Sequence, residues 1–235
     1  MEKTKDAAAV GAILKRLGLD GVFTEAGASR MELHTYADKE KVCTFGEHLD
    51  GLYVVAEGRL KVYHLLPSGK TMLLRFSKPP MLIGDAEWMG NEPAGNTVEA
   101  AGKATLLFLC RKDAMKTEMG NPAFLQFMIR NLSRKLNTLG NASSYNLLYP
   151  AENRVASYLL SLLPEARPHG GEKTEEEIRV SNLIEMAEML GTSYRHLNRV
   201  LRQLEGIGVL ERRRGVIKVL DERRLRTLAD DRLYK

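Results

Sequence analysis

The 235-residue sequence predicts an α+β protein: an N-terminal antiparallel β-roll, a long helix, and a C-terminal helical domain that ends in a β-hairpin. Strand-sized apolar runs separated by glycine-containing turns fill residues 31–111 and predict the roll. Apolar residues then recur every three or four positions over 122–148, which predicts the long helix. Two short helical patterns and a basic hairpin follow. The expected domains are 1–30, an N-terminal helical extension, 31–117, 118–149 and 150–235.

Composition excludes several classes of protein. With 44% hydrophobic and 28% charged residues, the chain is too apolar for an intrinsically disordered protein. Its longest apolar runs fall far short of the roughly 20 residues that span a bilayer. The two cysteines, Cys43 and Cys110, are too few for a disulfide framework or an iron–sulfur cluster. We therefore expect a soluble, cytoplasmic protein with no membrane partner, and two small buried thiols.

The first elements can be placed by periodicity. Residues 1–20 are predicted to form an amphipathic helix rather than a signal peptide, because Val10, Ile13, Leu14 and Leu17 share one helical face. Residues 67–70, Pro-Ser-Gly-Lys, have the composition of a hairpin turn. The expected strands of the roll are 52–55, 60–65, 72–76, 81–83 and 105–109.

The helix over 122–148 would be roughly 40 Å long, which is more than packing within one small domain requires. It either lies against the β-domain or forms a two-stranded coiled-coil seam between two copies of the chain. The second interpretation explains both the length and the apolar stripe. We therefore predict a homodimer with a seam formed by Leu125, Met128, Leu132, Leu136 and Leu139.

A helix over 151–163 and a loop rich in proline and glycine lead to a pattern with helix-turn-helix spacing. Ser181 is a plausible N-cap for a helix that runs to Leu190. Ala187 supplies the small residue where two helices cross, and Gly191 supplies the positive φ of a tight turn. A second helix is expected over 193–204. The predicted inward face comprises Leu190, Leu197, Val200, Leu201 and Leu204.

The outward face of this second helix carries polar forks and an N-terminal aromatic residue, which suits the major groove of DNA. Two expected strands, 209–213 and 216–220, form a basic hairpin like the wing of a winged helix. Residues 191–226 hold ten Arg or Lys against four acids, the footprint expected for phosphate. We expect double-stranded DNA as the partner, contacted by Ser181, Thr192, Ser193, Tyr194, Arg195, Asn198, Arg199, Arg202, Arg213 and Arg214.

The order of roll, long helix and winged helix-turn-helix resembles the CRP/FNR family of transcription regulators over residues 30–225. The start of the second helix, Ser193–Leu197, is similar to the YeiL-type subgroup. The resemblance implies a jelly roll like a cyclic-nucleotide-binding domain, a near-palindromic operator and RNA polymerase as a further partner. Of the family's recognition-helix pattern only Arg199 is matched, so no consensus operator is implied. The roll landmarks are Gly46, 52–58, 66–70, 82–85, 93–100 and the Asn121-Pro122 that starts the long helix.

The resemblance also implies an effector pocket, at which this chain departs from members that respond to cyclic AMP. Ala94 stands where those members place an arginine for the cyclic phosphate, and Asp85 adds a negative charge. We therefore predict no cyclic AMP binding and no cofactor, with Arg75 or Lys103 as the alternative cations. The pocket takes an uncharged or cationic ligand, or is filled by Met81, Trp88 and Met89. The pocket positions are Gly84, Asp85, Ala94, Gly95, Asn96 and Thr97.

Two other functions are weaker alternatives. A regulatory module acting on a protein partner would need the pocket arginine and would not need the basic wing. A cupin-type metalloenzyme would need several histidines and an acid converging on one ion, whereas His48, before the run 53–58, has no close histidine partner among the five in the chain. No catalytic constellation, phosphate-binding loop or metal-ligand pattern is visible, so we do not expect an enzyme.

Overall fold

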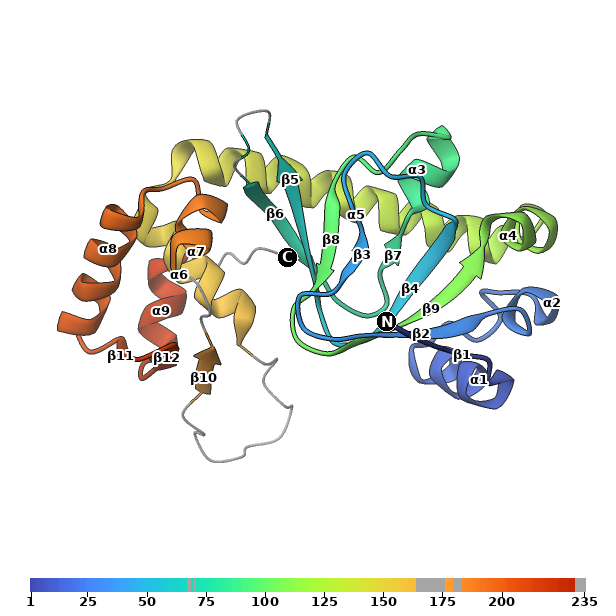
Figure 1. Cartoon of the computed structure of the whole chain (residues 1–235), viewed down its shortest axis with the longest axis horizontal. Helices are drawn as coiled ribbons and strands as arrows, with labels where there is room; N and C mark the ends of the chain where they lie inside the picture. The colour runs from blue at the N-terminus through green and yellow to red at the C-terminus, as the bar shows by residue number, and fades with distance from the viewer. Residues whose placement is uncertain (67–68, 70, 164–175, 180–182, 231–235) are drawn as a thin grey trace. The chain divides into compact units, whose positions relative to one another are not determined.

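The structure, a computed structural model, forms two compact units (Figure 1). The first unit comprises residues 1–65 and 74–139, and the second comprises 66–73 and 140–235. The long helix α5 (Pro122–Leu148) contributes to both units and has the bounds that its apolar stripe predicts. The structure describes residues 1–66, 69, 71–163, 176–179 and 183–230, and of residues 139–148, 176, 177, 179 and 188 it describes the backbone alone.

The first unit contains two antiparallel sheets, which confirms the predicted roll. One sheet has the order β1-β2-β9-β4-β7 and the other has the order β3-β8-β5-β6. All five predicted strands are present, as β4, β5, β6, β7 and β9. The strands are β1 (Glu2–Thr4), β2 (Glu32–Tyr36), β3 (Lys41–Cys43), β4 (Gly51–Glu57), β5 (Leu60–Leu65), β6 (Thr71–Ser77), β7 (Leu82–Ile83), β8 (Thr97–Ala100) and β9 (Ala104–Cys110).

Strand β4 lies between two hydrophobic cores. Leu52, Val54 and Ala56 pack into a core shared with the helices of this unit. Tyr53 and Val55 point to the opposite face, into the interior of the roll. Because side chains alternate across a strand, a strand buried on both faces has a continuous apolar sequence, as this one does. The helices of the first unit are α1 (Ala7–Arg16), α2 (Glu25–Ala28), α3 (Asp85–Gly90), α4 (Arg111–Thr117) and the part of α5 up to 139.

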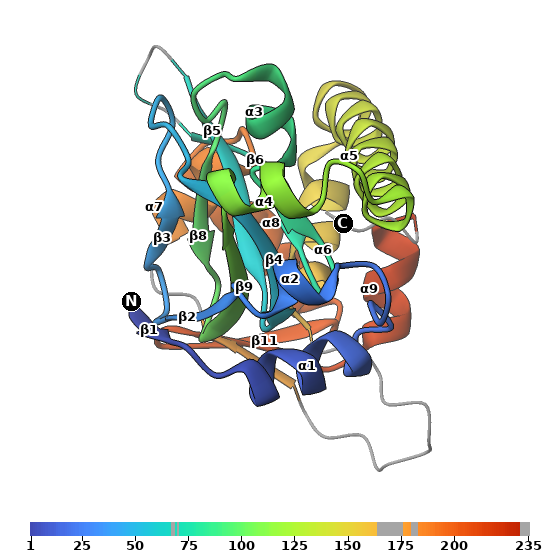
Figure 2. The ribbon, with the colours of Figure 1, turned by 90° about the vertical axis from the view of Figure 1, so that its right-hand side faces the viewer.

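The N-terminus differs from the predicted single helix over 1–20. Residues 2–4 form β1, which pairs with β2 so that Glu2 lies opposite Thr35. Helix α1 begins only after Asp6, whose carboxylate caps it by accepting a hydrogen bond from the Ala9 N–H at 2.9 Å. Val10 and Leu14 bury its apolar face, as predicted, in the core that β4 and β9 share with the helices, and Figure 2 shows α1 and α2 beside that sheet.

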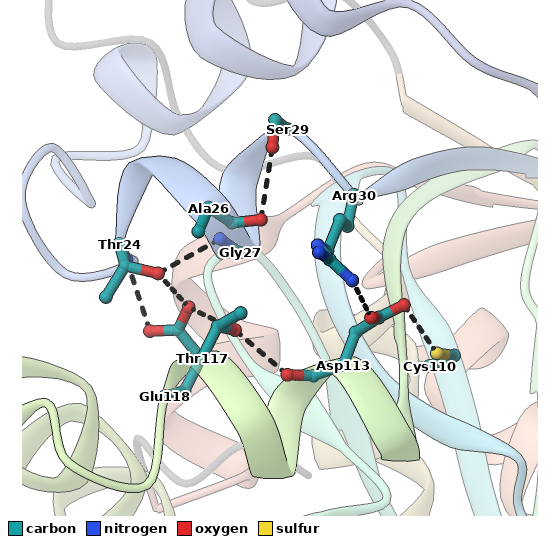
Figure 3. Close-up of polar contacts among 9 residues, drawn as sticks. All are labelled: Thr24, Ala26, Gly27, Ser29, Arg30, Cys110, Asp113, Thr117 and Glu118. Atoms are coloured by element: carbon teal, nitrogen blue, oxygen red, sulfur yellow. Dashed lines mark hydrogen bonds and ion pairs between the residues drawn. The ribbon is translucent and has the colours of Figure 1, made fainter.

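Helices α2 and α4 are joined by the fully buried Glu118 (Figure 3). Its Oε1 accepts from the Thr24 hydroxyl at 2.7 Å and the Thr117 hydroxyl at 2.9 Å. Its Oε2 accepts from the Thr24 N–H at 3.2 Å and the Asn121 side-chain amide at 3.1 Å. A Cβ on Gly27 would stand 1.8 Å from Oε1, so the close approach of α2 requires glycine there. The network fixes α2 against the start of α5.

We expect Glu118→Gln to destabilise the protein by about 1.5–3 kcal/mol, because the glutamine amide would face hydrogen-bond donors and leave them unsatisfied. Urea unfolding followed by circular dichroism measures the change. The control is Glu25→Gln on the exposed first turn of α2, which we expect to change the free energy of unfolding by about 0.5 kcal/mol or less. Equal effects of the two substitutions would contradict the structural role of Glu118.

Helix α5 is held against the first unit by one apolar and one polar contact zone. Phe124, Phe127 and Met128 are buried in the core shared with the helices. One turn later, the Asn131 side-chain oxygen accepts a hydrogen bond from the Leu82 N–H of β7 at 3.1 Å. Lys135 forms an ion pair with the buried Asp85 at the start of α3. The helix therefore lies against its own β-domain along one face.

These contacts correct one residue of the predicted dimer seam. Met128 is almost fully buried within its own subunit, so it is not available to a partner. Leu125 and Leu132 are half-buried against the same core, whereas Leu136 is exposed. Leu139 belongs to the residues whose side chains lie outside the description.

The second unit contains a three-stranded sheet of order β10-β12-β11 and a set of helices in which α6 packs against α8 and α9, and α7 against α8. Residues 67, 68 and 70 of the predicted turn and the predicted N-cap Ser181 lie outside the described residues, whereas Gly69 is described and adopts φ +79°. The elements are α6 (Ala151–Leu162), β10 (Glu176–Arg179), α7 (Leu183–Met189), α8 (Tyr194–Gly206), β11 (Leu210–Arg213), β12 (Val216–Val219) and α9 (Glu222–Leu228).

Candidate nucleic-acid interface

The turn between α7 and α8 has the geometry that the sequence predicts. Gly191 adopts φ +59°, in the left-handed region, and the Thr192 N–H donates to the Ala187 carbonyl at 2.9 Å. Ala187 is fully buried, as a small residue at a helix crossing should be. A Cβ on Gly191 would stand 3.3 Å from a guanidinium nitrogen of Arg154, which adds crowding to the conformational requirement for glycine. The two helices thus form a helix-turn-helix.

Helix α8 is strongly two-sided. Leu197, Val200, Leu201 and Leu204 are buried, which confirms the predicted inward face. The Ser193 hydroxyl caps the helix by accepting from the His196 N–H at 3.1 Å, so this candidate contact has a structural role. Thr192 beside it is half-buried. The outward face carries three exposed arginines and one half-exposed tyrosine: Arg195, Arg199, Arg202 and Tyr194.

Asn198 differs from these outward residues. Its side-chain amide nitrogen donates to the Tyr194 carbonyl at 3.1 Å, and its oxygen accepts from the Arg212 guanidinium at 3.2 Å. The side chain is half-buried between α8 and β11. Both polar ends of the amide therefore have partners within the protein, and the structure does not present Asn198 as an open fork for bases.

Strands β11 and β12 form the predicted wing beside α8 (Figure 1). Arg213 lies opposite Val216, and the two-residue turn between them contains Gly215 at φ +76°. Arg214 is exposed at the tip of this turn. Arg213 is also exposed, and its Nε lies 3.0 Å from Glu211 Oε1, so its charge is partly compensated. A third strand, β10, pairs with β12 and was not predicted because its first two residues, Glu176 and Glu177, are acidic.

Glu205 is an acid within this basic surface. The Arg212 N–H donates to its Oε1 at 3.1 Å, and the Arg212 Nε donates to its Oε2 at 3.2 Å. The hydrogen bond from the Arg212 backbone, followed by the Arg212 guanidinium and the charge of Arg202, lowers the pKa of Glu205. Glu205 is therefore ionised at neutral pH.

The predicted effector pocket starts at the N-terminus of α3. Gly84 adopts φ +90°, and a Cβ there would stand 2.8 Å from the Gly51 carbonyl oxygen. Asp85 is fully buried, and its Oδ1 pairs with Lys135 of α5. Burial lowers the pKa of Arg75 on β6, while the charges of Asp85 and Glu87 act in the opposite direction. The negative charge of Asp85 therefore acts on Arg75, the residue that the sequence analysis named as an alternative cation.

Several groups in the second half of the predicted pocket, residues 94–97, form hydrogen bonds within the roll. The Ala94 N–H donates to the Glu47 carbonyl at 2.7 Å, and the Phe45 N–H donates to the Thr97 hydroxyl at 3.1 Å. His64 Nδ1 lies 3.1 Å from the Gly95 carbonyl and 3.3 Å from the Asn96 side-chain oxygen. Ala94 is itself buried. The Ala94 N–H, the Gly95 carbonyl, the Asn96 side-chain oxygen and the Thr97 hydroxyl oxygen therefore have partners within the roll.

The aromatic and thioether residues expected to fill the pocket divide between different places. Met81 packs against the interior of the roll, as predicted. Trp88 instead lies in the helix-side core, with its ring 6.2 Å from that of Phe124, and Met89 is exposed. The interior holds Tyr36 and Tyr53, which the sequence analysis did not place there. Tyr36 ends a strand whose alternation with polar residues signals only half-burial, and the continuous apolar run around Tyr53 does not show which face each residue takes.

The remaining candidate chemistry is limited. Cys43 is buried, and burial raises the pKa of its thiol to about 12, whereas Cys110 is only half-buried and its thiol donates to Asp113 at 2.9 Å. Among the described residues, no group of three or more histidine, cysteine, aspartate or glutamate side chains is arranged to hold a metal ion. No helix in the described part of the chain is both long and apolar enough to cross a membrane.

Comparison with known proteins agrees with both parts of the structure. A family model described as "Cyclic nucleotide-binding domain" matches residues 33–117, and one described as "Crp-like helix-turn-helix domain" matches residues 153–228. The chain is 25% identical to the regulatory protein YeiL of Escherichia coli O157:H7, over 89% of this chain and 90% of that protein. It is 24% identical to the cyclic AMP receptor protein of Thermus thermophilus, over 90% of this chain and 94% of that protein.

A solved structure of a CRP-family transcriptional regulator from Thermus thermophilus has a TM-score of 0.69 to this chain at 26% sequence identity. The similarity covers 85% of this chain and 98% of that regulator. The two matched domains occur in the order that the roll and the winged helix-turn-helix have here. The chain is therefore a member of the CRP/FNR family of DNA-binding transcription regulators.

Proposed function

We propose that the protein is a homodimer that recognises a near-palindromic DNA operator by placing α8 in the major groove. The observation that carries the proposal is the two-sided α8, whose buried face fixes the helix while Arg195, Arg199 and Arg202 extend from the other face. Guanidinium groups read guanine bidentately, and the exposed Arg214 of the wing suits a phosphate contact. Such a regulator works in the cytoplasm, with RNA polymerase as its proposed protein partner.

Selection of bound duplexes from a random DNA pool tests this function. We expect an enriched near-palindrome whose half-sites are centred roughly 34 Å apart or slightly more, because a two-fold dimer meets the same groove one helical turn later. The control is the combined variant Arg195→Ala with Arg199→Ala, which we expect to enrich no motif. Failure of the unmodified protein to enrich any sequence would overturn the proposal.

A homodimer is supported by an exposed apolar pair on α5. Ile129 and Leu136 are 62% and 71% exposed, and their spacing of seven residues puts them on one line along the helix. Large apolar side chains exposed at heptad spacing are typical of a helix that pairs with a second helix. The half-buried Leu125 and Leu132 flank this line. We propose that the face of α5 that carries Ile129 and Leu136 forms the dimer contact. It differs from the predicted seam because Met128 is buried in its own subunit.

We further propose that the roll does not bind cyclic AMP. Ala94 offers no cation, and the Ala94 N–H, the Gly95 carbonyl and the Thr97 hydroxyl oxygen already have partners in the roll. Asp85 Oδ1 pairs with Lys135, so this lysine is already engaged, and Asp85 Oδ2 is buried without a hydrogen-bond partner among the described residues. Tyr36 and Tyr53 occupy the interior, and burial raises the pKa of Tyr36, so it remains uncharged. These two aromatic side chains therefore take up part of the interior of the roll.

Calorimetric titration with cyclic AMP and cyclic GMP is expected to give no binding heat, because a buried phosphate needs a fixed cation and several hydrogen-bond donors. The cyclic AMP receptor protein of Thermus thermophilus, titrated under the same conditions, is the positive control. A dissociation constant in the low micromolar range or tighter, accompanied by stronger operator binding, would show that the proposal is wrong.

A further inference from the structure

Glu205 is unusual among the described residues of α8 because it places a carboxylate beside a surface that must approach phosphates. Negative charge near DNA weakens binding through repulsion. Glu205 is nevertheless held in place by two hydrogen bonds from Arg212 of β11, one from the backbone N–H at 3.1 Å and one from the guanidinium Nε at 3.2 Å. The carboxylate thus joins the last turns of the recognition helix to the wing.

The same arginine extends the connection to the start of α8. Its Nη1 donates to the Asn198 side-chain oxygen at 3.2 Å, and the Asn198 amide donates to the Tyr194 carbonyl at 3.1 Å. The network therefore runs from Tyr194 to Glu205, about 16 Å along the helix axis at 1.5 Å per residue. It engages both polar ends of the Asn198 amide and two of the five N–H donors of the Arg212 guanidinium.

We propose that Glu205 and Arg212 are positioning residues that fix the wing against the recognition helix, and that Asn198 belongs to this link rather than to base readout. The inference rests on the proposed DNA-binding function. With the link intact, α8 and the wing tip meet DNA as one rigid body, so base contacts and phosphate contacts form in a single register. Without it, each contacts DNA independently.

The direction in which one substitution changes DNA binding distinguishes a positioning role from a purely electrostatic effect. Glu205→Gln removes a negative charge, so electrostatics alone predicts tighter binding to every DNA sequence. Positioning predicts instead that the ratio of operator affinity to non-operator affinity falls by about tenfold. The matched control is Glu211→Gln, which removes the same charge from β11 but breaks only the exposed contact with Arg213. We expect this control to leave the ratio unchanged.

Fluorescence anisotropy with a duplex selected by the unmodified protein, and with a scrambled duplex, measures both affinities. Arg214→Ala should lower operator affinity in the unmodified protein but have at most half that effect, in free energy, in Glu205→Gln, because the wing tip is then no longer held in register. Asn198→Ala, which removes an Arg212 acceptor and leaves the Glu205 contacts, should lower the specificity ratio and also reduce the effect of Arg214→Ala, which loss of a base contact alone would not do. Circular dichroism melts verify that each variant is folded. If Glu205→Gln does not fold, the measurements on Asn198→Ala decide the question.

Equal specificity ratios for Glu205→Gln and Glu211→Gln, together with full additivity with Arg214→Ala, would overturn the inference. This outcome is distinct from failure of the proposed function. If the unmodified protein selects no duplex, the DNA-binding proposal fails first. If it selects a duplex and the two glutamine variants behave alike, only the positioning role is wrong.

Discussion

Replacing Ile129 and Leu136 together by aspartate is expected to yield a folded monomer. Both side chains are exposed on the described surface of α5 and lie two helical turns apart, so in a symmetric pair of helices each protomer buries two. Burial of a large aliphatic side chain contributes about 1.5–3 kcal/mol, so losing four weakens the dimer by about 10⁴-fold or more. Four aspartates at the contact add like-charge repulsion. Operator affinity is expected to fall when the dimer is lost, because a monomer cannot hold both half-sites at once.

Sedimentation velocity at micromolar concentration measures the effect. The control pair, Arg130→Asp with Arg134→Asp, places the same new side chains at exposed positions of α5 away from the apolar line, and should leave the dimer intact. A double Ile129 and Leu136 variant that still sediments as a dimer would show that the subunits meet through another surface. Met128→Asp is expected to unfold the first unit instead, because Met128 lies in its core.

Arg195→Ala and Arg199→Ala are each expected to relax the choice of base at one position per half-site. A bidentate arginine–guanine contact discriminates by about 1–3 kcal/mol, which is about 5- to 150-fold in relative affinity. The two arginines stand one turn apart on the outward face of α8, so the positions they affect should be neighbouring. Arg214→Ala should instead weaken binding to all sequences alike and reduce the slope of log affinity against log salt by about one.

Repeating the duplex selection with each variant shows which base position loses its preference. Titrations at several salt concentrations separate the wing from the helix. Uniform weakening by all three substitutions, with no position-specific change, would mean that α8 is not the element that reads bases. Arg195 and Arg214 are suitable for this comparison because both side chains are exposed. The neighbouring Arg212 is not suitable, because Glu205 holds its side chain.

The sequence was sufficient to predict an element where the spacing of apolar residues within that element shows which face is buried. The stripe over 122–148 predicted α5, and the inward leucines of α8 followed from helical spacing alone. Glycine at 191 predicted the turn, because the positive φ is a property of that residue. The apolar runs of β4 and β9 were recognisable as strands because both of their faces are covered.

The sequence failed where a distant segment decides the outcome. Residues 2–4 are polar and residues 176–179 are polar except for Ile178, and both segments form strands by pairing with β2 and β12. Helical spacing places Asn198 with the outward arginines, but Arg212, fourteen residues later, engages its side chain. The stripe on α5 likewise does not reveal which apolar residues face the β-domain, so Met128 was assigned to the wrong side. Each of these errors, including the two missed strands, arises from a contact with a segment that is distant in the sequence or in another element.

Strand β7 is only two residues long, and those two residues belong to different cores. Ile83 faces the interior of the roll, whereas Leu82 faces the helices and donates its N–H to Asn131 of α5. The sheet that contains β4, β7 and β9 lies between these two cores. In β7 a single peptide bond, which is stiff, joins a residue of one core to a residue of the other. A group that displaced Ile83 from within would therefore act, one residue away, on the hydrogen bond that holds α5, giving the roll a short mechanical path to the helix that carries Ile129 and Leu136.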